Sequence, residues 1–127
     1  MKTKAIKTFT AVITLGLEIG YSKELYKKSF LIQTLQEYQR HRIDEASIYL
    51  SASITECIIV LGGQEEKHLK LEFINYPRFP LDVEVFKNEI IKLGSHLLNQ
   101  MQQNRTVIVF TDETIMLEVD EGIDPRI

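Results

Sequence analysis

The residues of this 127-residue chain whose types most readily do chemistry are three histidines and one cysteine. His41, His68 and His96 stand far apart, and none has a second metal ligand at helical or strand spacing. A zinc site draws three or four ligands, often with two of them one helical turn apart. Cys57 lies in an apolar stretch beside an acidic residue, which does not favour a thiolate. We therefore predict no metal site and no cofactor, and a role for Cys57 as a small core residue.

A first candidate ligand site combines Tyr49, Glu18 and His68. Carboxylates and imidazoles serve as general acids and bases, so these side chains could act together in a pocket between sheet and helices. Simple exposure to solvent accounts for these three side chains equally well, because charged residues are found mostly at the surface. They are the polar positions that we predict for a pocket.

A second candidate site is the segment from Asn75 to Pro80. Two prolines stiffen it, while Tyr76, Arg78 and Phe79 offer ring and cation contacts to a ligand or partner. Packing of the aromatic rings against the end of the core is the competing explanation. This segment is the loop that we would mutate first.

Two surfaces favour association with a partner. Tyr26 and Phe30 stand one helical turn apart, away from the core stripe of the first expected helix. The expected sheet also has one face rich in threonine and serine that helices on the other face cannot cover. Solvent, a loop, a ligand or a second subunit could cover either surface. We predict a homo-oligomer, most simply a dimer, with a small-molecule or protein partner.

Composition excludes several classes of protein. A hydrophobic fraction of 44% with 26% charged residues is ordinary for a globular domain. A net charge of -3 and the lack of an aromatic platform on the expected strands argue against nucleic-acid binding. The longest apolar run, Cys57 to Leu61, is far shorter than the roughly 20 residues of a membrane helix. One cysteine and no signal-peptide pattern predict a cytoplasmic location.

Hydrophobic periodicity predicts the elements of the first half of the chain. Alternation from Phe9 to Ile19 indicates a long strand with its odd-numbered positions buried. Ser22 is expected to cap a helix over residues 23–42. Residues 46–61 alternate again but change parity, which predicts a bulge near residues 55–56.

The second half has clearer signals. Gly62 and Gly63 predict a hairpin turn into a strand at residues 67–74, and they lack the lysine and hydroxyl residues of a phosphate-binding loop. Asp82 is expected to cap a helix with apolar residues spaced three and four apart as far as Met101. Asn104 is expected to end this helix in a left-handed conformation. A last hairpin is predicted at residues 107–119.

The resulting order is strand, helix, strand, strand, helix, strand, strand. We expect a single domain over residues 1–127, with residues 120–127 as a loose tail. The order resembles the α+β ferredoxin-like superfold, βαββαβ, with an added C-terminal strand and with two helices packed on one face of a mainly antiparallel sheet. This resemblance rests on element order. The superfold hosts metabolite-binding regulators, dimeric cofactor-free oxygenases and RNA-binding domains, so it implies no function by itself.

We interpret the sequence as a cytoplasmic, non-enzymatic module that self-associates and binds a small molecule or protein partner, because no catalytic set stands out. The alternative is a small cofactor-free enzyme with its pocket between the sheet and the helices.

Overall fold

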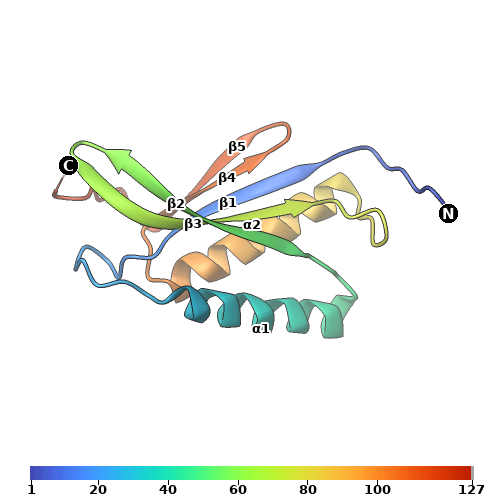
Figure 1. Ribbon diagram of the computed structural model, residues 1–127, viewed down its shortest axis with the longest axis horizontal. Coiled ribbons are helices and arrows are strands. Elements are labelled where there is room, and N and C mark those ends of the chain that lie inside the picture. Colours follow the sequence, from blue (N-terminus) through green and yellow to red (C-terminus); the bar gives the residue numbers. More distant parts are fainter. Residues whose placement is uncertain (127) are drawn as a thin grey trace.

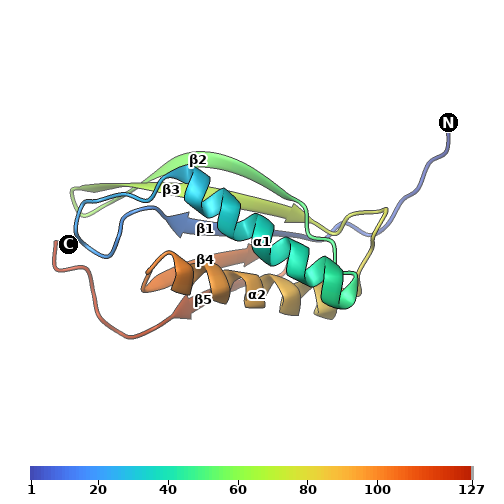
Figure 2. The ribbon, with the colours of Figure 1, turned by 90° about the horizontal axis from the view of Figure 1, so that it is seen from below.

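Five strands form one antiparallel sheet in the computed structural model, which describes residues 1–126 (Figure 1). In chain order the elements are β1 (Thr10–Gly16), α1 (Lys28–Ala46), β2 (Ala52–Leu61), β3 (Gln64–Ile74), α2 (Val83–Gln100), β4 (Arg105–Phe110) and β5 (Thr114–Glu118). The strands lie side by side in the order β2-β3-β1-β4-β5. Figure 2 shows both helices on the same face of the sheet. The expected ferredoxin-like layout is confirmed, with β5 as the added strand at the β4 edge.

The core lies between this sheet and the two helices. The central strand β1 pairs with β3 on one side and with β4 on the other. Its odd-numbered residues Ala11, Ile13 and Leu15 are completely buried, which confirms the predicted inward face. The β1 ladder ends at Gly16, although Leu17 still donates a backbone hydrogen bond to Lys67 at 3.1 Å.

The first helix begins later than predicted, at Lys28 instead of residue 23. Ser22 does not cap it, because the Ser22 hydroxyl donates to the Ile19 carbonyl at 2.6 Å and accepts from the Glu24 amide at 3.1 Å. Residues 17–27 therefore form a loop, and Leu25, expected in the core, is 45% exposed. The short polar side chain of Ser22 stabilises a turn as readily as a helix end.

The predicted bulge in the second strand is absent from residues 52–61, which pair with β3 in one continuous register from Ala52–Phe73 to Leu61–Gln64. The parity change has another cause, since Ile58 and Val60 share the helix-side parity of Ile54 yet are 61% and 68% exposed. The strand continues beyond the cover of the helices. The turn after it is as predicted, with φ of 57° and 78° at its two glycines.

The second helix forms as predicted. Asp82 caps it, with its carboxylate accepting from the Glu84 amide at 3.0 Å, and Phe86, Ile90 and Leu93 are buried below it. The expected left-handed residue after the helix is not Asn104 but Gln102, with φ of 52°. Within residues 1–126, no helix combines the length and apolar character needed to cross a membrane.

Candidate functional site

The loop of residues 17–27 closes one end of the sheet. Gly20 and Lys23 have φ of 56° and 69°, so the backbone turns sharply at both positions. The Glu18 carboxylate accepts from the Lys23 amide at 2.8 Å, and Glu18 also forms a β-bridge with Leu25. These contacts fix the Glu18 carboxylate at the end of the sheet.

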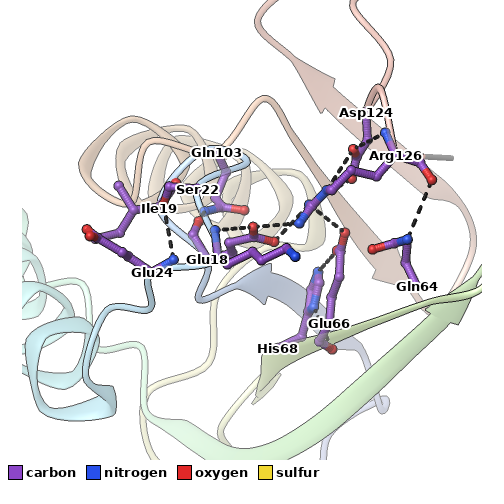
Figure 3. Close-up of polar contacts among 11 residues, drawn as sticks. Glu18, Ile19, Ser22, Glu24, Gln64, Glu66, His68, Gln103, Asp124 and Arg126 are labelled. Carbon is purple, nitrogen blue, oxygen red and sulfur yellow. Dashed lines mark hydrogen bonds and ion pairs between the residues drawn. The ribbon is translucent and has the colours of Figure 1, made fainter.

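Arg126 lies at the centre of a carboxylate cluster at this end (Figure 3). Its Nη1 and Nη2 donate to the two oxygens of Glu18 at 2.8 and 2.9 Å. Its Nε and Nη2 donate to Asp124 at 3.0 and 2.9 Å, and Nη2 lies 3.7 Å from Oε1 of Glu66. Hydrogen bonds from Arg126 lower the pKa of both Glu18 and Asp124, while these carboxylates raise the pKa of Arg126. Three carboxylates thus surround one guanidinium, and Lys23 and Lys67 line the same pocket as Glu18 and Glu66.

Gly16 makes room for two further polar side chains beside this cluster. A Cβ atom at Gly16 would collide with Oε1 of Gln103 and would lie 3.3 Å from Nε2 of His68. The Gln103 amide donates to the Glu18 carbonyl at 2.7 Å, and Nε2 of His68 lies 3.9 Å from the Glu66 carboxylate. Acid, imidazole and amide groups therefore meet at one end of β1.

A hollow of about 560 Å³ lies between this loop, the end of α2 and the segment after β5. Tyr21, a residue that is 46% exposed, lines it together with Asn99, Gln102 and Asn104. The Gln102 amide donates to the Tyr26 hydroxyl at 2.6 Å, which ties the end of α2 to the loop. The volume falls within the roughly 300–1,000 Å³ of small-molecule sites. One ring and several amides suit a planar ligand with donor and acceptor groups on its edges.

The opposite end of the molecule carries a cluster of exposed aromatic rings. Tyr49 and Phe79 stack with ring centroids 4.3 Å apart, and Tyr76 lies 6.2 Å from Phe79. The Arg78 guanidinium lies 5.6 Å from the Phe79 centroid. The Asn75 side chain exchanges hydrogen bonds of 2.8 and 2.9 Å with the backbone of Leu81, which fixes the loop. Each of the three aromatic residues is more than a third exposed.

The structure separates the first predicted set of site residues. Glu18 and His68 lie at the same end of the sheet, connected through Arg126 and Glu66. Tyr49 lies in the aromatic cluster at the other end, so it does not share a pocket with them. The second set, Tyr76, Arg78 and Phe79, does lie together, and its role in binding stays a prediction.

The predicted interface pair has a local role. Tyr26 and Phe30 stack with centroids 5.0 Å apart, and Phe30 remains 39% exposed while Tyr26 packs against the core. Contact with a partner through these rings stays a prediction.

Cys57 is half-buried and pairs with His68 in the sheet, which places it on the outer face of β2 instead of in the core. Among residues 1–126, no group of three or more His, Cys, Asp or Glu side chains is arranged to hold a metal ion.

Sequence reasoning missed Arg126, Asp124, Gln103 and Tyr21. Residues 120–127 were expected to be loose; within that segment Asp124 is only 7% exposed and Arg126 makes the contacts given above, while Ile127 lies outside the described residues. Arg126 and Glu18 stand 108 positions apart, and no local spacing relates them. The signal available was the triplet Asp124-Pro125-Arg126, in which a proline stiffens the backbone between two opposite charges.

This fold resembles solved structures of a phage enzyme. A phage SAM lyase in the apo state superimposes with a TM-score of 0.70 and 19% sequence identity, over 91% of this chain and 92% of that one. A phage SAM lyase in complex with S-methyl-5'-thioadenosine gives a TM-score of 0.70 and 17% identity, over 97% and 98% of the two chains. The sequence matches no protein-family model and no curated protein. At these identities the likeness establishes a shared fold.

Proposed function

We propose that this chain is a small cofactor-free enzyme that binds a thioadenosine nucleoside and cleaves S-adenosylmethionine. The observation that carries the proposal is the hollow of about 560 Å³ lined by Tyr21 and several amide side chains, at the end of a fold shared with a SAM lyase. An exposed ring offers a stacking surface to a purine, and amides can pair with its edge. These features favour the enzyme alternative over the non-enzymatic module that the sequence suggested.

The proposed chemistry requires no group that the chain does not supply. S-adenosylmethionine becomes S-methyl-5'-thioadenosine when the bond between the sulfonium sulfur and its amino-acid fragment breaks and the electron pair returns to sulfur. The fragment completes its valence when its own carboxylate oxygen bonds to the carbon that left sulfur, which closes a lactone, or when the neighbouring carbon gives a proton to a carboxylate side chain of the protein and a carbon–carbon double bond forms. Both routes balance without water, oxidant or reductant.

The charge of the cluster suits such a substrate. Glu18, Glu66 and Asp124 offer three carboxylates around the single guanidinium of Arg126, and a sulfonium is a fixed cation that a carboxylate can face. Carboxylates at one end of a site attract a cationic substrate and release a neutral thioether more readily. We therefore place the nucleoside in the hollow and the sulfonium end toward the carboxylates.

Calorimetric titration with S-methyl-5'-thioadenosine tests the binding, and chromatographic detection of the same nucleoside after incubation with S-adenosylmethionine tests the reaction. Tyr21→Ala should weaken nucleoside binding about ten-fold, since stacking on a ring is worth roughly 1–3 kcal/mol per base. Tyr21→Phe is the matched control, because it keeps the ring that would stack on the base and removes only the hydroxyl. Wild-type protein that neither binds the nucleoside nor produces it refutes the proposal.

We further propose that the chain forms a homodimer. The end of β2 carries four consecutive apolar residues, Ile58 to Leu61, with exposed fractions from 38% to 68%. Exposed apolar edge strands commonly pair with another chain. Light scattering at high micromolar concentration should show a dimer that Val60→Lys dissociates and that Val85→Lys, on the surface of α2, leaves intact. A monomeric wild-type protein contradicts this expectation. The cytoplasmic location and the lack of nucleic-acid binding stay predictions.

A further inference from the structure

The segment of residues 119–126, which we call the strap, forms one side of the hollow. Val119, Asp120, Gly122 and Ile123 line it. Apolar packing does not hold the strap in place, because Val119 and Ile123 are 63% and 75% exposed. The position of this wall therefore depends on polar contacts at the two ends of the strap.

The near end of the strap is held by Asn104 and Arg105. The Asn104 side chain accepts from the Asp120 amide and donates to the Gly122 carbonyl, both at 3.1 Å. Arg105 also donates to the Gly122 carbonyl. Asn104 directly precedes β4 and Arg105 is its first residue, and the pairing of Arg105 with Glu118 of β5 brings both beside the start of the strap.

The far end of the strap is held by Arg126. Its guanidinium forms a two-pronged contact with Glu18, continues to Asp124, and lies 5.5 Å from the centroid of the Tyr21 ring. The Gln64 amide reaches the Arg126 carbonyl at 3.5 Å. Arg126 thus fixes two walls of the hollow together, the strap and Tyr21. A planar guanidinium makes this fork, and a lysine ammonium cannot reproduce it.

We propose that Arg126 is a positioning residue that holds the strap and Tyr21 in place around the ligand, and that binding of the nucleoside in turn holds the strap. The inference rests on the proposed function for the identity of the ligand. Coupling between two sites is reciprocal. If the ordered strap increases the affinity for the nucleoside, bound nucleoside must therefore protect the amides of the strap from hydrogen exchange to the same extent. Loss of Arg126 should raise KM for S-adenosylmethionine and leave kcat close to its wild-type value.

The experiment compares Arg126→Ala with Arg126→Lys and with the control Arg78→Ala. Arg78 also lies over an aromatic ring, 5.6 Å from the Phe79 centroid, but at the opposite end of the molecule. Amide hydrogen exchange without ligand should increase over residues 119–126 in Arg126→Ala, should remain raised in Arg126→Lys, and should be unchanged in Arg78→Ala. Glu18→Gln, which removes the charge that faces Arg126, should give the same regional increase if the alanine variant does not fold.

Titration with S-methyl-5'-thioadenosine completes the test. Arg126→Ala should bind about ten-fold more weakly than wild type, within the usual range of coupling between sites. Unchanged exchange in the strap overturns the inference, and so does increased exchange with unaltered nucleoside affinity. If the wild-type protein does not bind the nucleoside, the proposed function fails, whereas the exchange of the strap still decides whether Arg126 holds it.

Discussion

The ion pair between the two helices gives a sharp test of how this fold is stabilised. Arg42 of α1 donates to Glu89 of α2 through Nε at 3.0 Å and also through Nη2. The Glu89 side chain is 6% exposed and that of Arg42 is 20% exposed. The hydrogen bond with Glu89 raises the pKa of Arg42, which keeps the guanidinium charged. Arg42→Ala leaves a buried carboxylate without its partner.

Breaking a buried pair in this way costs about 3–5 kcal/mol, and the partial exposure of Arg42 places this case near the lower limit, at about 3 kcal/mol. For a domain of this size that corresponds to a decrease of about 12 °C in Tm. The double variant Arg42→Met, Glu89→Leu should recover most of the loss, because apolar residues of similar volume replace the pair without a buried charge.

Urea unfolding followed by circular dichroism measures these changes as shifts in midpoint at constant slope. Arg42→Lys is a useful companion, since it keeps the charge and removes the fork. A cost below about 1 kcal/mol for Arg42→Ala would mean that water solvates Glu89 freely. A double variant as unstable as Arg42→Ala would show that the loss comes from packing, and either result refutes the reasoning.

Four further predictions follow, the first three measured by urea unfolding and the fourth by amide hydrogen exchange. Lys23→Gly should raise stability by about 1 kcal/mol, because Lys23 has a left-handed φ of 69°. If a helix began at Lys23, the same substitution would instead lower stability. Asn75→Ala should lower stability by about 2 kcal/mol, since two backbone groups of the loop lose their partner. Gly94→Val should lower stability by about 2 kcal/mol, because even a Cβ atom there would lie 2.9 Å from Cδ1 of Ile108. The pKa of Glu18 is lowered in the folded protein, so its contribution is complete above the ordinary value of 4.5 and is lost as the pH falls through the lower folded value. Exchange protection of the strap should fall in that acidic range, and in Glu18→Gln it should already be reduced at neutral pH.

Where a local pattern agrees with the fold, the sequence predicted the structure well. The alternation around Ile13 and the cap at Asp82 correspond to a buried strand face and a helix start in the structure. The start of α1 could not be predicted, because Ser22 can cap a helix or close a turn with the same hydroxyl. The choice depends on the left-handed residues around it, and Lys23 gives no sign of that conformation.

The candidate site was predicted in part for a similar reason. Glu18 and His68 were named from residue type, and the antiparallel register of β1 and β3 then brought them to one end of the sheet. Arg126 could not be assigned to Glu18, since the sequence has 18 acidic residues and no periodic relation selects one of them. The path of the backbone after β5 decides which carboxylate Arg126 contacts.

The late start of α1 explains both the candidate site and the exposed strand end. Lys28, the first residue of the helix, forms an ion pair with Glu56 at 3.3 Å, so the helix begins beside the middle of β2. Beyond that point Ile58 and Val60 have no helix above them. Five more helical residues would have added about 7.5 Å of cover at 1.5 Å per residue, enough to reach Ile58, which lies roughly 6.6 Å beyond Glu56 along the strand. Those residues instead form the loop that positions Glu18 and Tyr21, so the uncovered end of β2 and the hollow arise from the same departure from the sequence pattern.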